Sequence, residues 1–262
     1  MAHNLTVEKK DAVAIVTLNR PEVRNAFDDL LISSLNRTLQ ELEKDDTVRA
    51  VVLAGAGKAF CAGADLNWMK RMAGYSYEQN LADAQALAGM LRSLDRLSKP
   101  TLARVHGPAY AGGVGLVAAC DIAVGSHEAE FCLTEVKLGL SPATISPYVV
   151  RAMGERLARR YFLTAEVISA GEAHRLGLLS AVTARDDLDG TIDAILGHLV
   201  AGGREAQARI KDLVRAVSTG AIDDAMIADT AKRIADIRVS REGREGIASF
   251  LEKRKPAWMG KN

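Results

Sequence analysis

The 262-residue sequence has few cysteines, no excess of either charge and no long hydrophobic run. Its three cysteines are too few for a disulfide framework, and none forms a C-x-x-C pair that would indicate zinc. The 34 basic and 33 acidic residues leave a net charge of +1, which exerts no long-range attraction on nucleic acid or an anionic membrane. No stretch is typical of a signal peptide or a membrane span. We therefore expect a cytoplasmic protein that binds neither nucleic acid nor membrane.

The sequence also lacks the common patterns for nucleophilic and metal chemistry. There is no G-x-S-x-G motif, and Cys61 has no histidine near it in sequence, so we expect a buried thiol there. Because no two histidines have metal-binding spacing, we expect no metal and no separate cofactor. His106, at the end of an apparent strand, is expected either to make a structural hydrogen bond or to line a pocket. The other histidines are interpreted as surface or core residues: His3, His127, His174 and His198.

What the sequence does contain is a repeated alternation of strand and helix patterns, with enough apolar residues (48%) to fill a large core. The helix expected over residues 28–45 places Leu31, Leu35, Leu39 and Leu42 on one face. Alternating strands and helices predict an α/β fold with mainly parallel strands. From about residue 186 only helical patterns follow, and this tail is expected to pack on the main domain or to join subunits. Strands are expected at 5–9, 13–18, 49–55 and 101–106, and a further helix at 78–97.

The glycine-rich stretch AYAGGVGLVAACD, residues 109–121, has three interpretations. Its glycines could simply allow a neighbouring element to pack closely. Residues 113–118 also match a dinucleotide-binding fingerprint, but that fingerprint directly follows the first strand of a βαβ unit, and this stretch does not. The third interpretation is an anion site, because glycines that open a helix leave backbone N–H groups free. The residues alone leave the choice open.

A second stretch has the same design. In GKAFCAGADLNWM, residues 57–69, small residues leave a loop that follows an apolar strand and then enter a helix. The GAGK sequence before Phe60 is not a phosphate-binding P-loop, because the hydroxyl residue after Lys58 is missing. If the strands before the two stretches are neighbours in one sheet, two N–H groups could converge on one oxygen and form an oxyanion hole.

Five ordered motifs give the chain a resemblance to a known family: NRPEVRNAF, GKAFCAGADL, HGPAYAGGVGLVAACDIAV, AEFCLTEVKLGLSP and LTAEVISAGEAHRLGLLSAV. With these motifs it resembles the crotonase, or enoyl-CoA hydratase/isomerase, superfamily nearly from end to end. The resemblance implies an α/β spiral of ββα units over residues 1–195 and a helical trimerisation region over 196–262. It also implies an acyl-CoA thioester as substrate and a homotrimer, or a hexamer made of two trimers.

The resemblance also implies roles for individual residues. The oxyanion N–H groups fall on Ala62 and Gly112, which would bind the thioester carbonyl. Arg24 would lie near a phosphate of coenzyme A. The rest of the coenzyme would lie along the first loop, whose implied substrate-binding residues are Ala62, Gly63, Ala64, Asp65 and Leu66, together with Gly112 of the second loop.

The chain departs from the commonest hydratase pattern, in which two glutamates hold one water. The first glutamate is replaced by Gly115, and the second falls on Glu135, between apolar residues. Burial there should raise the pKa of the carboxyl group toward the range of a general acid–base catalyst. A single carboxylate suits hydration or an isomerase that moves a proton between the γ- and α-carbons. A non-catalytic acyl-CoA-binding scaffold is the remaining alternative.

At finer detail, GADLNWM and the terminal FLEKRKPAW look like bacterial methylglutaconyl-CoA hydratases and the related isohexenylglutaconyl-CoA hydratases. Their substrates are branched glutaconyl thioesters with a distal carboxylate, which would need a cationic or hydrogen-bonding partner. Trp68, Met69 and Met72 are expected either in the core or against the acyl chain. Candidate partners for the distal carboxylate are Lys70, Arg71, Ser141, Thr144 and Ser146.

Overall fold

The computed structural model describes residues 4–260 and contains one large, mainly parallel sheet. Its strand order is β1-β2-β3-β4-β6-β9, and only the β1–β2 pair is antiparallel. The mainly parallel arrangement predicted from the sequence is therefore confirmed. The strands are β1 (Leu5–Lys10), β2 (Val13–Leu18), β3 (Ala50–Gly55), β4 (Thr101–Val105), β6 (Ile122–Ser126) and β9 (Ala181–Thr183).

A second, three-stranded sheet lies beside the first and carries the segments of chemical interest. It consists of β5 (Ala109–Tyr110), β7 (Glu130–Cys132) and β8 (Ile168–Ser169) in the order β5-β7-β8. β5 and β7 are parallel, with Tyr110 opposite Cys132. The glycine stretch that starts at β5 is thus placed directly beside the segment that leads to Glu135.

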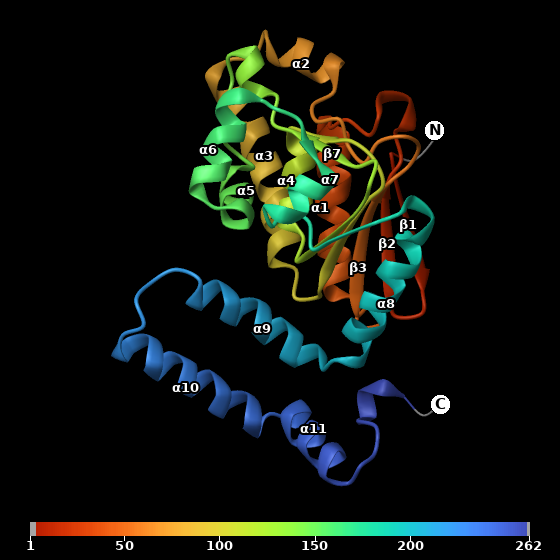
Figure 1. Cartoon of the computed structure of the whole chain (residues 1–262), viewed down its shortest axis with the longest axis vertical. Helices are drawn as coiled ribbons and strands as arrows, with labels where there is room; N and C mark the ends of the chain where they lie inside the picture. Colours follow the sequence, from red (N-terminus) through yellow and green to blue (C-terminus); the bar gives the residue numbers. More distant parts are fainter. Residues whose placement is uncertain (1–3, 261–262) are drawn as a thin grey trace.

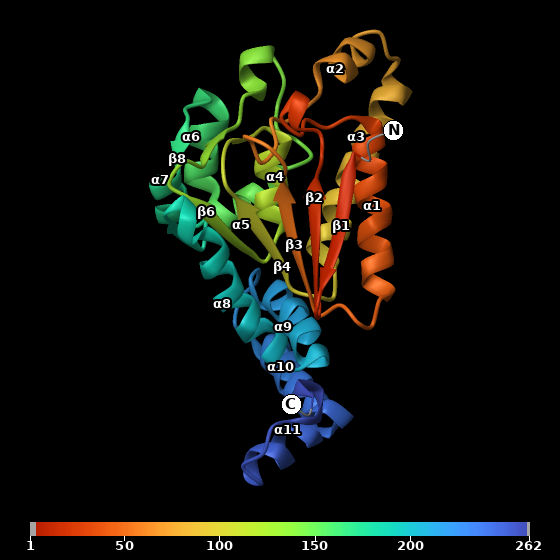
Figure 2. The same ribbon diagram turned by 90° about the vertical axis from the view of Figure 1, so that its right-hand side faces the viewer.

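Helices cover both faces of the large sheet (Figures 1 and 2). On one face the predicted leucine stripe of α1 (Asp29–Lys44) is confirmed, since its four leucines are at most 3% exposed. On the other face, α8 (Leu188–Ala201) packs Leu188, Ile192 and Leu196 against β3, β4 and β6. The remaining helices of the sheet domain are α2 (Leu66–Met72), α3 (Tyr77–Arg96), α4 (Gly112–Ala119), α5 (Ser146–Met153), α6 (Glu155–Thr164) and α7 (Ala170–Arg175).

The helical tail extends away from the sheet domain (Figure 1). It contains α9 (Arg204–Val217), α10 (Asp224–Val239) and α11 (Arg241–Leu251). Neither α9 nor α10 has a buried residue. The boundary expected between residues 195 and 196 falls inside α8, because the apolar face of that helix belongs to the sheet domain up to Leu196. The projecting part therefore begins at α9.

Over residues 4–260, no helix combines the length and the apolar character needed to cross a membrane.

Candidate active site

The two small-residue loops lie side by side at the carboxyl ends of neighbouring strands. The first loop, residues 59–65, follows β3, and the second, residues 106–111, follows β4, which pairs with β3 in parallel. Cys61 and Ala109 form a parallel bridge, and the Tyr110 N–H donates to the Cys61 carbonyl at 2.9 Å. The neighbouring strands on which the oxyanion hypothesis depends are therefore present.

Close packing accounts for the absence of side chains at Gly112 and Gly113. A Cβ atom at Gly112 would lie 2.6 Å from the Phe27 ring, and one at Gly113 would lie 2.5 Å from the Cys61 carbonyl oxygen. Both distances are too short for any larger residue. The dinucleotide interpretation does not hold for this stretch, because Gly113 and Gly115 lie inside helix α4 rather than in a turn that follows a strand.

Helix α4 begins with an N–H group that is free to meet a ligand. Ala111, the N-cap, has φ 47° and ψ −117°, a conformation that costs a non-glycine residue roughly 1–3 kcal/mol. Its carbonyl accepts from the N–H groups of Val114 and Gly115. Within residues 4–260, no carbonyl or side chain accepts a hydrogen bond from the Gly112 N–H. This group has the availability that an oxyanion donor requires.

The N–H of Ala62, in contrast, is already engaged. It donates to the carbonyl of Arg24 at 2.9 Å. The oxyanion role implied for Ala62 would therefore require this hydrogen bond to be shared with, or yielded to, a substrate oxygen. Gly63 has φ 89°, and a Cβ atom there would lie 2.9 Å from the Ala111 side chain. The first loop thus approaches the second as closely as its backbone allows.

A buried asparagine that the sequence analysis did not single out supports the first loop. Asn25 is fully buried with φ 56°, a backbone region that asparagine tolerates better than most residues. Its side-chain amide nitrogen donates to the carbonyls of Ala56, Ala59 and Phe60 at 2.8, 2.9 and 3.2 Å. The asparagine in NRPEVRNAF could have signalled this turn, but its distant partners could not be deduced from the motif.

Two of the implied substrate-binding residues have different surroundings. The Asp65 side chain is 6% exposed, caps α2 by accepting the N–H groups of Asn67 and Trp68, and pairs with Arg20 at 2.9 Å. Its carboxylate therefore supports the loop from inside instead of facing a ligand. Leu66, the first residue of α2, is 73% exposed. Arg24 is exposed and makes no ion pair with any of residues 4–260.

Glu135 begins a short 3-10 helix, η2 (Glu135–Leu138), next to the second loop. Cys132, three residues before it, accepts a hydrogen bond from the Ala111 N–H at 2.8 Å. The Glu135 side chain is half-buried, and its Oε2 atom is shielded from solvent with no hydrogen-bond partner among the described residues. Burial raises the pKa of the Glu135 carboxyl group above its usual value of 4.5, as expected from its apolar flanks.

The site has an apolar wall where a second carboxylate is expected in a two-glutamate hydratase. A Cβ atom at Gly115 would lie 2.7 Å from the Cβ of Ile145, which is 1% exposed. Helices α4 and α5 can pack this closely only because Gly115 has no side chain. The space beside α4 is therefore filled by Ile145.

The candidate partners for a distal carboxylate differ in availability. Arg71 is paired with Asp29 at 2.7 Å, and the Ser146 hydroxyl donates to the Ala143 carbonyl at 2.8 Å. Lys70 and Ser141 are exposed and Thr144 is half-buried, and the side chains of these three make no hydrogen bond or ion pair with residues 4–260.

The aromatic and methionine residues of α2 belong mostly to the core. Trp68 is 5% exposed and donates its indole N–H to Asp83 at 3.1 Å, and Met72 packs against the same core cluster. Met69 is half-buried. Core packing is thus the better interpretation for Trp68 and Met72.

The remaining polar candidates have structural roles. His106 is 4% exposed and its Nε2 contacts the Gly57 carbonyl at 3.0 Å, so it holds the segment before the first loop. Cys61 is buried, and burial raises its pKa to about 12, which makes it a poor nucleophile, as expected. His3 lies outside the described residues. In the part of the chain that is described, no three His, Cys, Asp or Glu side chains are grouped so as to hold a metal ion.

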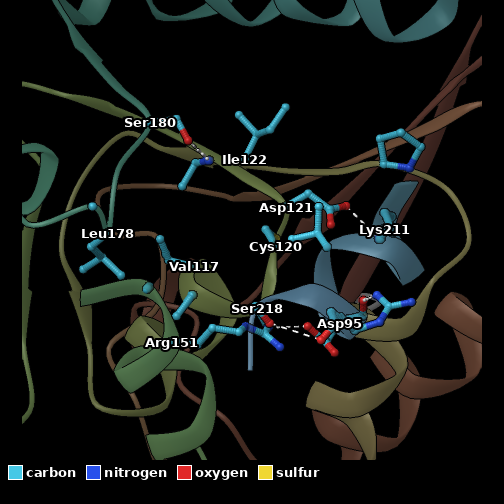
Figure 3. A pocket seen from close by; sticks show the side chains of 18 of the residues that line it. Asp95, Val117, Cys120, Asp121, Ile122, Arg151, Leu178, Ser180, Lys211 and Ser218 are labelled. Atoms are coloured by element: carbon cyan, nitrogen blue, oxygen red, sulfur yellow. Dashed lines mark hydrogen bonds and ion pairs between the residues drawn. The ribbon is translucent and has the colours of Figure 1, made fainter. Parts of the chain in front are cut away.

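A cavity of about 730 Å³, whose lining is shown in Figure 3, lies at the opposite end of the sheet from the two loops. It lies between the carboxyl end of α4 and helix α9, near the Asp121–Lys211 ion pair of 2.7 Å. Pro100 and Ile122, at the amino ends of β4 and β6, line it, whereas neither Glu135 nor the two loops do. Ligands of parallel α/β sheets bind outside the carboxyl ends of the strands, so the candidate active site is the pair of loops.

Comparisons with known proteins show what the whole chain is similar to. The sequence pattern of the family described as Enoyl-CoA hydratase/isomerase matches residues 8–261. The crystal structure of an enoyl-CoA hydratase from Shewanella pealeana is similar, with a TM-score of 0.95 and 43% identity over 98% of this chain and 96% of that one.

Two curated relatives are similar over nearly their whole length. The short-chain-enoyl-CoA hydratase of Clostridium acetobutylicum is 32% identical over 97% of this chain and 96% of its own. The 1,2-epoxyphenylacetyl-CoA isomerase of Escherichia coli is 32% identical over 97% of each chain. With a family match over almost all residues and a mixed α/β fold that carries a helical C-terminal region, this chain belongs to the enoyl-CoA hydratase/isomerase family of the crotonase superfamily.

Proposed function

We propose that this protein hydrates a 2-enoyl-CoA thioester, and that the acyl group is a branched glutaconyl group such as 3-methylglutaconyl. The observation that carries the proposal is Glu135: a half-buried carboxyl group with one unpartnered, shielded oxygen, on the segment next to the free N–H of Gly112. An acid–base group beside an oxyanion donor is the minimum that enolate chemistry requires.

In the proposed reaction, the free N–H of Gly112 donates to the thioester oxygen, and the N–H of Ala62 shares its hydrogen bond between the Arg24 carbonyl and that oxygen. Negative charge collects on that oxygen when water attacks the β-carbon, so donors that are already in place stabilise the enolate more than the neutral carbonyl, by roughly 3 kcal/mol per donor. Glu135 takes a proton from the attacking water and returns one to the α-carbon. A C–O bond and a C–H bond form, the double bond is lost, and no electrons leave the substrate.

A single carboxylate must then carry out both proton transfers. Ile145 occupies the space beside Gly115, so no second acidic side chain can stand there without repacking α4 against α5. The alternative is an isomerase in which Glu135 moves a proton from the γ- to the α-carbon without water. Among the curated relatives, a protein named putative enoyl-CoA hydratase from Thermus thermophilus is 37% identical to this chain and the 1,2-epoxyphenylacetyl-CoA isomerase is 32% identical, which favours hydration.

The proposed glutaconyl substrate carries a carboxylate at the far end of its acyl group. Lys70, on the exposed face of α2 just after the first loop, makes no ion pair within residues 4–260 and is the candidate cation. Arg71 is less available because it is paired with Asp29.

The test follows the ultraviolet absorbance of the conjugated thioester with 3-methylglutaconyl-CoA, crotonyl-CoA and a 3-enoyl-CoA. We expect the absorbance to fall fastest with 3-methylglutaconyl-CoA. A gain of absorbance with the 3-enoyl-CoA alone would establish the isomerase instead. No change with any of the three would support the non-catalytic scaffold. Because we propose that no metal or separate cofactor takes part, addition of EDTA should leave the rate unchanged.

We also propose that the protein assembles as a homotrimer, or as a hexamer of two trimers, through its helical tail. Helices α9 and α10 border a groove of about 880 Å³, and the tail exposes apolar side chains such as Ile234 (48%), Ile247 (51%) and Phe250 (82%). Apolar surface of this extent is typical of a protein interface. Light scattering should give three or six times the chain mass of 28.1 kDa, and Ile234→Asp should lower it. A monomeric wild-type protein would refute this assembly.

A further inference from the structure

Arg20, two residues after the end of β2, is a largely buried cation that joins the starts of two helices. Its side chain is 16% exposed. Its Nη2 atom lies 2.9 Å from Oδ2 of Asp65, and its Nη1 atom lies 3.0 Å from Oδ2 of Asp28 and donates to the Ala26 carbonyl at 2.6 Å. Asp28 is the N-cap of α1, and Asp65 is the N-cap of α2 at the end of the first loop. One guanidinium therefore holds both caps.

The Asp65 carboxylate divides its two oxygens between helix α2 and Arg20. Oδ1 accepts the N–H groups of Asn67 and Trp68 at 2.8 and 3.2 Å. Oδ2 accepts from Arg20 and, within residues 4–260, from no other group. Because Asp65 is only 4% exposed, loss of Arg20 would leave a buried charged oxygen without a partner. The carboxylate would then turn toward water and release the start of α2 from the loop.

The segment that ends at Asp65 contains an N–H group without an acceptor. Phe27 donates its N–H to the Gly63 carbonyl at 2.6 Å and accepts the Asp65 N–H at 2.7 Å. In this parallel bridge Ala64 directs its own N–H to the opposite side, where no group of residues 4–260 accepts it. The same segment lies against the second loop, since a Cβ atom at Gly63 would be 2.9 Å from the Ala111 side chain.

We infer that Arg20 is a positioning residue that, through Asp65, fixes the direction of the free Ala64 N–H beside that of Gly112. This inference rests on the proposed acyl-CoA function, in which backbone donors meet the thioester oxygen. Unlike the Ala62 N–H, the Ala64 N–H can meet a ligand without giving up a hydrogen bond. A hydrogen bond weakens steeply with misalignment, so such a donor must be held in place before charge develops. Because the Arg20 guanidinium is bonded to the protein, its effect should appear in kcat rather than in KM.

A matched pair of substitutions isolates the connection from Arg20 to the first loop. Asp65→Asn and Asp28→Asn each keep a side-chain oxygen that can cap the helix, and each removes one ion pair with Arg20. Both should lower Tm slightly. Only Asp65→Asn should also lower kcat, by about 10- to 100-fold at an unchanged KM, because only Asp65 belongs to the loop. Arg20→Lys keeps the charge but not the two-armed geometry, so it should lower kcat as well.

Three kinetic results would overturn the positioning role. An equal loss of kcat in Asp28→Asn and Asp65→Asn would show that the ion pairs support the fold in general. A wild-type kcat in Asp65→Asn would show that the donors do not depend on Arg20. A raised KM at an unchanged kcat would show that Asp65 acts in substrate binding instead.

Binding of 2,4-hexadienoyl-CoA gives a readout without turnover and separates this inference from the hydratase proposal. The conjugated carbonyl absorbs at longer wavelength when hydrogen bonds polarise it. The bound probe should therefore be red-shifted equally by wild type and Asp28→Asn, and less by Asp65→Asn. Equal shifts with all three proteins, or no shift with wild type, would overturn the inference even if the enzyme is a hydratase. The expected difference without any hydration activity would refute the hydratase proposal alone.

Discussion

Glu135→Gln should separate activity from stability, because the same burial that suits the carboxyl group to catalysis weakens the fold. The substitution keeps the size and the polar oxygen of the side chain but removes its ability to accept and return a proton. General acid–base catalysis contributes about 10²- to 10⁴-fold, so kcat should fall by that factor. Folding and coenzyme A binding should be retained.

The stability effect has the opposite sign. Because burial raises the pKa of Glu135, the folded protein holds its proton more tightly than the unfolded chain does. Stability is therefore lost as the pH rises from the ordinary value of 4.5 through the raised value, and the penalty is fully present above it. Burying an ionised carboxylate costs more hydration free energy than burying a neutral amide, and because the side chain is only half-buried the difference is small, about 1 kcal/mol. At neutral pH the Gln variant should be more stable by about this amount, or about 2–4 °C in Tm.

The assay combines thermal unfolding at neutral pH and near pH ~4 with turnover of the enoyl thioester. The gain in Tm should shrink at the lower pH, where the carboxyl group is mostly protonated in both states. In wild type, kcat/KM should rise with pH through the raised pKa of Glu135. A variant with near-wild-type turnover, or a Tm below wild type at neutral pH, would show that Glu135 is a solvated surface residue and would refute the reasoning.

Three further substitutions and one control test the framework of the fold and the site. Gly115→Ala should lower the free energy of unfolding in urea by about 1–3 kcal/mol, because the added methyl group meets Ile145. The control Gly190→Ala, with open space around it, should raise the free energy of unfolding by about 0.5–1 kcal/mol. Equal effects of the two substitutions would contradict the packing argument. Asn25→Ala should lower the free energy of unfolding by about 2–3 kcal/mol and also lower kcat, because three carbonyls lose their donor. A loss of stability without a loss of kcat would show that Asn25 does not support the site. Ala165→Gly should raise the free energy of unfolding by about 1 kcal/mol and leave kcat unchanged, because Ala165 has φ 48°, which strains a residue with a Cβ atom. A lower Tm would show that the packing of its methyl group outweighs this backbone strain.

Much of the fold could be predicted from local patterns. The strand expected at 13–18 has these bounds in the structure, and the leucine spacing of α1 correctly identified its buried face. These patterns are reliable because a helix or strand buries a face that repeats every 3.6 or 2 residues, and that repeat is visible in the sequence. The boundary at 195/196 stays a prediction, and it lies within α8, whose core face continues to Leu196.

The same local reading identified the two loops and the raised pKa of Glu135, because small residues at a helix start and apolar flanks are features of adjacent residues. Local patterns could not show which polar groups of the loops are already hydrogen-bonded to other parts of the protein. Asp65 is a helix cap paired with Arg20, and the Ala62 N–H is held by Arg24, 38 residues earlier in the chain.

Adjacent residues were thus sufficient to indicate the elements, the family and the kind of chemistry in this protein. The folded chain was needed to show which donors are free, why position 115 has no side chain, and how Arg24 is linked to the site. The physical reason is that packing contacts and hydrogen bonds join residues far apart in sequence, such as Gly115 with Ile145 and Asn25 with Ala59. Their geometry exists only once the strands have brought those residues together.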